Sequence, residues 1–407
     1  MPKLYFNATR HADLPLHYGH VPPWLAERMS KLGGAITESI LLEYGKTGFL
    51  SRLSDPFWFQ AFGCVLGMDW HSSGITTSVM GALKRALNPR VNELGIYICG
   101  GKGKYSRQTP AELTAYANRT GLNGNDLVRF SRLTAKVDNN TIQDGFQIYL
   151  HTFVVTKEGQ WAVVQQGMNE MSGMARRYHW HSENIHSFIE DPHTFIYGQN
   201  QGTILNLTDV QAADAKNSML DIVSQDPGRI LPEIRKAVLP SHHELTAADV
   251  NIKRLGAMLT LAHEREITDF EELLLLEGVG PRTIQSLALV SEIIHGAPAR
   301  FEDPGRFSFA HGGKDGHPFP VPLKVYDDTI HHLQHAVEKA KIGDKEKAEA
   351  IRNLSIAAQA MEAGFNPDPD LFEKAVIRER RDSHKYGGRT IFGDASKPPD
   401  DGQLSLF

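Results

Sequence analysis

The residues FQIYLHTFVVTKEGQWAVVQQ, at positions 146–166, decide the fold of the N-terminal half of this chain. Two runs rich in β-branched and aromatic residues, Phe146–Thr156 and Gln160–Gln166, flank the triplet KEG, which is typical of a hairpin turn. We therefore expect two antiparallel strands joined by a tight turn. Gly95–Cys99 has the same residue character and predicts a further strand in this half.

Helical periodicity surrounds and follows these strands. The mixture predicts an α+β fold, with an α+β domain of the catalytic type over residues 1–205. Residues 206–300 predict a helical domain, 301–377 a loop and helical region, and 378–407 a flexible tail that is charged and rich in Gly and Pro. The expected helices are Pro23–Leu50, Thr76–Leu87, Ala213–Ser224, Arg229–Val238, Ala247–Glu264, Phe270–Leu276, Val325–Lys341 and Asp344–Ala363.

The bulk composition limits the classes of protein to which the chain can belong. The formal net charge is −5, so any nucleic-acid surface must be a local basic patch. The two cysteines, Cys64 and Cys99, lie in apolar runs and are expected to be small buried side chains in a reducing compartment. No apolar run approaches the roughly 20 residues of a membrane span, and the N-terminus lacks a secretory signal pattern. We expect a cytoplasmic, nucleoid-associated protein without a membrane partner.

The residues LLEGVGPRT, at 275–283, resemble the turn of a helix-hairpin-helix. The glycines permit a tight reversal, and Val279 fills the space between the two helices. Free amides of Gly280, Arg282 and Thr283 at the start of the second helix would hold a phosphate, assisted by the helix dipole. Such contacts position a nucleic-acid backbone without reading its sequence. An ordinary pair of helices with glycine caps is the alternative.

The last five residues, QLSLF, resemble the peptide with which bacterial proteins bind the DNA polymerase sliding clamp. Three apolar side chains would enter a preformed pocket, a glutamine would bond at its rim, and the polar residues before them would serve as a tether. An apolar tail that packs on its own domain is the alternative. The expected clamp contacts are Gln403, Leu404, Leu406 and Phe407.

Three clusters in the N-terminal half have the residue types of a phosphodiester-cleaving site. The first is 67–74, where Asp69 and His71 would project to one side of an extended segment. The second is the glycine-rich basic loop 100–107, which suits a phosphate but lacks the spacing of a P-loop. The third combines the hairpin with residues 175–183, where His179 and His181 would share a side next to two arginines.

These clusters predict a site in which a bound Mn²⁺ or Mg²⁺ activates water. Histidine acting as a general base without metal is the alternative, and a structural role for most of the 19 histidines stays open. The expected catalytic residues are Asp69, His71, His151, Gln165 and His179. The expected metal ligands are Asp69, His71, His151, His179 and His181. The expected DNA contacts are Lys102, Lys104, Arg107, Arg176, Arg177, Gly278, Gly280, Arg282 and Thr283.

Several of these strings together resemble the domain-of-unknown-function 763 family of bacteria and archaea. The resemblance extends through the glycine turn to about residue 370. It implies a divalent-metal-dependent DNA endonuclease that acts on structured substrates such as stem-loops, but it assigns no residue to a catalytic role. The strings that carry it lie at residues 14–17, 23–25, 69–74, 100–103, 161–168 and 175–180.

Three functions are therefore to be weighed. The first is a metal-dependent endonuclease for structured DNA, in repair or replication, that the sliding clamp recruits. The second is an adaptor that binds branched or looped DNA and docks on the clamp without catalysis. The third is an enzyme that acts on nucleotides or RNA through the glycine-rich loop. The cleavage position and the oligomeric state stay open, with a homodimer as one arrangement.

Overall fold

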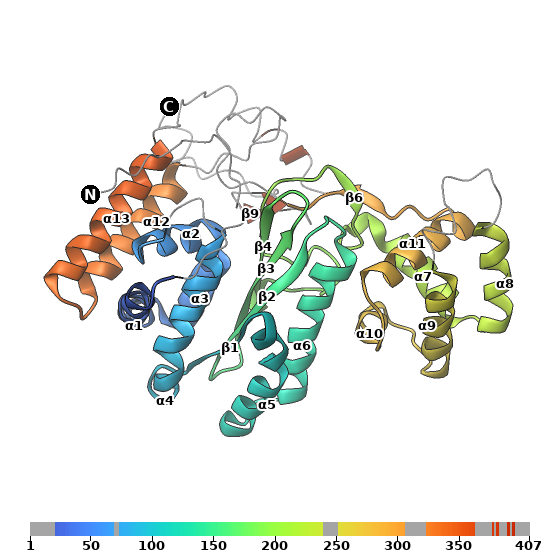
Figure 1. The fold of residues 1–407 in the computed structure, drawn as a ribbon, viewed down its shortest axis with the longest axis horizontal. Helices are drawn as coiled ribbons and strands as arrows, with labels where there is room; N and C mark the ends of the chain where they lie inside the picture. Colours follow the sequence, from blue (N-terminus) through green and yellow to red (C-terminus); the bar gives the residue numbers. More distant parts are fainter. Residues whose placement is uncertain are drawn as a thin grey trace.

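The computed structural model describes residues 21–68, 73–238, 251–305 and 323–362, with a few further positions between 377 and 394. Figure 1 shows a central antiparallel sheet with helices on both of its faces and a further group of helices at one end of the molecule. The sheet has five strands in the order β1-β2-β3-β4-β5. The chain therefore has the α+β fold that the sequence predicts.

The described strands form one five-stranded sheet and two smaller antiparallel pairs. The central sheet consists of β1 (Ile96–Lys102), β2 (Gln147–Thr156), β3 (Trp161–Asn169), β4 (Met174–His181) and β5 (Phe195–Tyr197). Two antiparallel pairs lie outside it, namely β6 (Thr203–Leu205) with β7 (Arg300–Glu302), and β8 (Arg389–Thr390) with β9 (Gly393–Asp394).

The helices fall into those before β2 and those after β5. The first group is α1 (Pro23–Ser54), α2 (Pro56–Val65), α3 (Gly74–Leu87), α4 (Val91–Leu94), α5 (Thr109–Thr120) and α6 (Gly124–Lys136). The second group is α7 (Ala213–Ser224), α8 (Pro227–Val238), α9 (Ile252–Glu264), α10 (Phe270–Leu275), α11 (Pro281–His295), α12 (Leu323–Lys339) and α13 (Asp344–Glu362).

The hairpin of β2 and β3 is formed as predicted. Val155 lies opposite Trp161, and Gly159 in the turn adopts a φ of 92°, a left-handed conformation that favours glycine. Further along the hairpin His151 lies opposite Gln165, and on the next strand pair Gln165 lies opposite Tyr178. Because side chains of directly opposed residues project to the same face, this register decides which polar groups meet.

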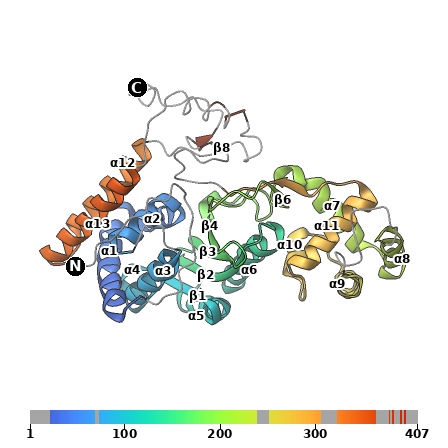
Figure 2. The same cartoon turned by 45° about the horizontal axis from the view of Figure 1, so that its top comes forward.

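Both faces of the sheet are buried. On one face, which we call the α6 face, Phe153, Val163 and Trp180 belong to a core that continues into α5, α6 and the helices α7 to α11. On the other, which we call the α1 face, Val154 and Val164 belong to a core shared with α1, α2, α3, α12 and α13. Figure 2 shows these two groups of helices on opposite sides of the sheet.

The sequence patterns locate most of these elements. The expected helix Ala213–Ser224 has those bounds in the structure, and Pro23–Leu50 lies within α1, which is kinked at Gly45, where φ is 69°. The patterns assign no element to α2, α5 and α6, or to β4 and β5. Helix α6 has a polar composition, so its amphipathic pattern is the only signal of it in the sequence.

Two expectations from the composition can be compared with the structure. Cys64 and Cys99 are buried thiols, as expected. Among the described residues, no helix combines the length and the hydropathy that a membrane-spanning segment requires.

Candidate functional site

The centre of the α6 face is a buried carboxylate, Asp138, at the end of helix α6. The helix continues there into a π-helical turn, Val137–Thr141, which turns Asp138 toward the sheet. Its carboxylate accepts hydrogen bonds from Gln165 Nε2 at 2.5 Å, Trp180 Nε1 at 3.0 Å and His193 Nε2 at 2.5 Å. Burial raises the pKa of Asp138, while His193 and Trp180 oppose that rise. One carboxylate thus joins α6 to two strands and to the loop after β4.

A second chain of hydrogen bonds runs from Gln165 to the middle of α6. Gln165 Oε1 lies 2.8 Å from His151 Nδ1, and His151 Nε2 lies 2.9 Å from the Ser131 hydroxyl. Gln165 Nε2 also donates to the carbonyl of Thr134. Burial lowers the pKa of His151 from 6.5 to about 4, so its ring is neutral at pH 7. Both ring nitrogens are occupied, so His151 and Gln165 position α6 on the sheet.

His179 belongs to the opposite side of the sheet. Its Nε2 accepts a hydrogen bond from Arg177 Nε at 2.8 Å, and its Nδ1 lies 2.9 Å from the carbonyl of Leu53 in α1. Burial, and secondarily the charge of Arg177, hold the pKa of His179 well below its usual range. His181 follows two residues later on the α1 face, where its Nε2 is buried and bonds to no described residue.

The sheet therefore separates His151 from His179 and His181. The expectation that these three histidines share a metal site is corrected, because a β-sheet lies between them and two of them have both nitrogens bonded. Within the described ranges no group of three His, Cys, Asp or Glu side chains is arranged to hold a metal ion. Asp69 and His71 lie outside the described residues, as do Gln403, Leu404, Leu406 and Phe407.

Arg176 and Arg177 are both fully buried. Arg176 bonds the carboxylates of Asp144 at 2.7 Å and of Asp303 at 2.6 Å, and it also donates to the carbonyl of Gln199. It thereby ties β4 to the segment after β7. The expected role of Arg176 in DNA binding is corrected, since its charge is already neutralised inside the protein.

Arg177 is held in a different way on the α1 face. Its guanidinium bonds Gln60 and the carbonyl of Pro56, and it lies over the rings of Phe59 and Tyr197 at 4.6 and 5.0 Å. Burial lowers the pKa of Arg177 to about 10. Its expected contact with DNA is also corrected, because no part of the side chain reaches the surface.

The glycine-rich loop at the end of β1 does present its cations to solvent. Lys102, Lys104 and Arg107 are exposed and form no ion pair with a described residue. Lys102 lies 5.6 Å above the ring of Tyr149. Gly100 at the base of this loop has a φ of 83°, and a Cβ there would lie 2.3 Å from the carbonyl oxygen of His151. The glycine thus permits β1 to approach β2 closely.

The glycine turn lies between α10 and α11. Gly278 is exposed with a φ of 80°, Val279 is buried between the helices, and Gly280 is the N-cap of α11. The amides of Gly278, Gly280 and Arg282 donate to no acceptor among the described residues. The amide of Thr283 does not belong to this set, because it donates to the carbonyl of Gly280 at 3.0 Å. The expected contribution of Thr283 is corrected accordingly.

Helix α6 and the segment that follows it also hold this turn in place. Lys136 Nζ donates to the carbonyl of Val279 at 2.5 Å, and Gln143 Nε2 donates to the carbonyl of Pro281 at 2.8 Å. About two helical turns before Lys136, Arg129 bonds Glu271 of α10 at 2.6 Å. Arg254 of α9 approaches the carbonyl of Gly278 at 3.5 Å. The free amides therefore lie among cationic side chains.

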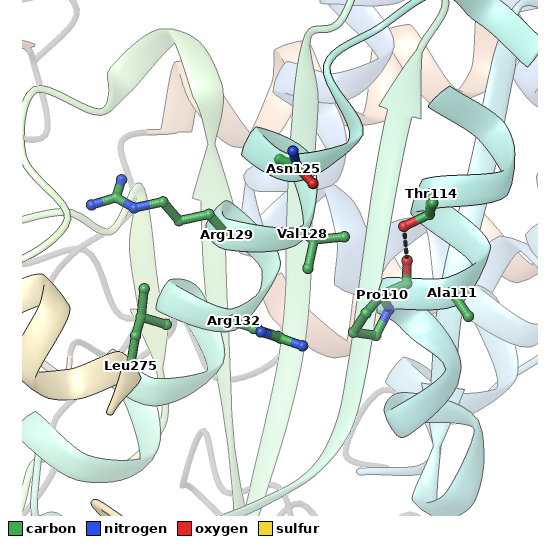
Figure 3. Close-up of a pocket in the computed structure, with 8 residues that line it drawn as sticks. All are labelled: Pro110, Ala111, Thr114, Asn125, Val128, Arg129, Arg132 and Leu275. Atoms are coloured by element: carbon green, nitrogen blue, oxygen red, sulfur yellow. Dashed lines mark hydrogen bonds between the residues drawn. The ribbon is translucent and has the colours of Figure 1, made fainter. Parts of the chain in front are cut away.

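A groove of about 530 Å³ opens beside this arrangement, between α5, α6 and the end of α10. Arg129, Arg132, Asn125 and Val128 of α6 line it, and Leu275 of α10 closes one side. In Figure 3, Arg132 lies toward Pro110 of α5, while Arg129 extends to the other side of α6. None of these residues is among the site residues expected from the sequence. The spacing of positions 125, 128, 129, 132 and 136, which places them on one helix face, is the signal that could have found them.

The neutral state of His151 predicts how stability depends on pH. Its pKa is near 4 in the folded protein and about 6.5 in the unfolded chain, so the unfolded chain binds more protons between these values. The contribution of neutral His151 to the stability of the fold is therefore fully present above pH 6.5 and is lost as the pH falls toward 4. Urea unfolding at a series of pH values measures this loss. Between pH 6.5 and pH 4 the free energy of unfolding of His151→Gln should fall by roughly 3 kcal/mol less than that of the wild type. An unaltered slope in His151→Gln would contradict the assignment.

Comparison with known proteins gives one match. No curated protein and no solved structure is significantly similar to the chain. Residues 10–321, which include the central sheet, α6 and the glycine turn, match a family described as "Protein of unknown function (DUF763)". The chain therefore belongs to the DUF763 family.

Proposed function

We propose that this chain binds the backbone of structured DNA at the glycine turn and cleaves it as a divalent-metal-dependent endonuclease in DNA repair or replication. The observation that carries the DNA-binding part is the group of amides of Gly278, Gly280 and Arg282, which point to no described acceptor at an exposed turn. Amides at the start of a helix bind phosphate well, because the helix dipole adds to their own partial charge.

The charges around the turn support the same function. Lys136, Arg254 and Arg282 approach or flank the amides, and none of them forms an ion pair with a described carboxylate. The chain as a whole carries a formal charge of −5, so this local group of cations would have to supply the attraction. Contacts of this kind hold the backbone without base readout. The turn would therefore bind DNA without a preference for sequence.

The salt dependence of DNA binding tests the proposed contact at the turn. Arg282→Ala removes a cation beside the free amides, so it should weaken binding of a stem-loop oligonucleotide and reduce the slope of log K against log salt by about one. Fluorescence anisotropy between about 50 and 200 mM salt measures both quantities. The matched control is Arg119→Ala, since Arg119 is an exposed arginine of α5 that bonds Asn92. Equal behaviour of the two variants would contradict the proposed contact.

The catalytic part of the proposal depends on Asp69 and His71, which lie outside the described residues. The histidines of the sheet do not fit a metal set, so we assign no metal to them. The glycine-rich loop with Lys102, Lys104 and Arg107 would hold a second phosphate. The adaptor that binds DNA without cleaving it is the second candidate, because the turn alone accounts for binding.

Cleavage assays separate these two candidates. Purified protein is incubated with a labelled stem-loop DNA and Mn²⁺, Mg²⁺ or a chelator. The endonuclease predicts strand cleavage that the chelator abolishes and that Asp69→Ala or His71→Ala reduces by at least about 100-fold. His186→Ala, at an exposed histidine, should cleave like the wild type. Binding without cleavage in the presence of either metal ion would favour the adaptor. If RNA or free nucleotides are cleaved and DNA is not, the chain would be an enzyme that acts on RNA or nucleotides.

Recruitment by the sliding clamp is a separate part of the proposal. The motif Gln403, Leu404, Leu406 and Phe407 supplies apolar anchors that would bind a preformed pocket with modest affinity. Leu404→Ala with Phe407→Ala should abolish capture by immobilised bacterial clamp and leave stem-loop binding unchanged. Ser405→Ala is the matched control, because position 405 is the variable one in the motif. Loss of DNA binding in the double variant would mean that these residues have a structural role instead.

A further inference from the structure

The groove beside α6 has a distribution of charge that differs from that of the glycine turn. Arg129 is already bonded to Glu271 at 2.6 Å, so its guanidinium is neutralised and held in a fixed orientation. Arg132 is exposed and forms no ion pair with a described residue. Helix α6 therefore places one paired guanidinium and one free guanidinium on the same wall of the groove.

The remaining lining is apolar or weakly polar. Val128 and Leu275 are half-buried and form apolar surface within the groove, and the Asn125 amide supplies hydrogen-bonding groups at its end. A volume of about 530 Å³ lies in the range of sites for small organic ligands. Guanidinium planes stack on nucleobases, and an apolar floor favours the flat faces of a base over a hydrated phosphate. The groove thus suits an unpaired base that stacks on the free guanidinium of Arg132.

The groove and the glycine turn lie along one face of α6. Positions 125, 129, 132 and 136 follow one another on this face, and Lys136 bonds the carbonyl of Val279 in the turn. Seven residues separate Arg129 from Lys136, which is about 10 Å along the helix axis. A strand of B-form DNA advances about 3.4 Å per nucleotide, so this span corresponds to a few nucleotides.

We propose that the groove between α5 and α6 binds an unpaired nucleotide of the same DNA strand whose phosphate lies at the glycine turn. This inference rests on the proposed function. A base in a loop costs less to unstack than a paired base, so the groove would add affinity for stem-loops and little for continuous duplex. The turn would then hold any backbone, while the groove would select the structured substrate.

Binding of two DNAs of equal length, a stem-loop and a full duplex, tests this proposal with the full chain in chelator. Stacking of one base contributes about 1–3 kcal/mol, so Arg132→Ala should weaken stem-loop binding by roughly 5- to 100-fold and leave duplex binding unchanged. Arg132→Lys keeps the charge without the planar group and should recover only part of the loss. Ala111→Trp, which fills the groove from α5 without removing a charge, should have the same selective effect. A 2-aminopurine in the loop, but not in the stem, should change its fluorescence on binding.

The outcomes separate this inference from the proposed function. If the wild type binds neither DNA, the proposed function fails. If it binds both, and Arg132→Ala and Ala111→Trp weaken both equally or neither, the turn still binds backbone but the groove does not hold a nucleotide. A stem-loop RNA of the same sequence that binds more tightly than the DNA, with the same dependence on Arg132, would overturn the assignment to DNA. Arg132 is exposed, so an unchanged unfolding midpoint is expected for its variants.

Discussion

The arrangement of the candidate site depends on one buried carboxylate, Asp138. An ionised carboxylate inside a protein is costly unless its oxygens accept hydrogen bonds, and three donors from three different elements meet here. Because those donors sit on β3, on β4 and in the loop after β4, satisfying the charge also fixes the end of α6 relative to the sheet. His151 and Gln165 repeat this anchoring one turn earlier, through Ser131 and Thr134. The polar side chains that were expected to be catalytic thus bind the face of α6 that packs on the sheet. The opposite face of α6 remains accessible.

The other face of α6 connects the sheet to the helical half of the chain. Arg129 bonds α10, Lys136 bonds the glycine turn, and Gln143 bonds the first residue of α11. These contacts are polar and partly exposed, so each alone contributes little to stability. Together they fix an orientation, because they hold α10, the glycine turn and the start of α11 against α6 and the segment that follows it. The apolar core that runs from the sheet through α6 into α7–α11 supplies the stability, and the polar contacts decide where the free amides point.

Local patterns were enough to predict the hairpin, the α+β class and most helices, since these depend on residues close together in the sequence. The site could not be predicted in the same way. Whether His151 and His179 face one another depends on the register of β2, β3 and β4, and a shift of one residue would exchange the faces. Arg176 could be recognised as buried only with knowledge of Asp303, which lies 127 residues away in the sequence. The glycine turn was found because its chemistry is contained in nine consecutive residues. The groove residues of α6 show only helical spacing, which carries no chemical signal of its own.

The cations of this protein fall into two classes that sequence composition treats alike. Arg176 and Arg177 are buried, and their guanidinium groups bind carboxylates, carbonyls and aromatic rings inside the protein. Lys102, Lys104, Arg107, Arg132 and Arg282 are exposed and have no carboxylate partner among the described residues. Only the second class can bind phosphate. Salt screening limits the reach of those exposed cations to about one Debye length, roughly 8 Å at physiological salt. Under the proposed function they would hold DNA that has already arrived but attract it poorly from a distance, since the net charge of the chain is −5. A separate recruiting element, such as the proposed clamp contact of Gln403, Leu404, Leu406 and Phe407, would then complement them.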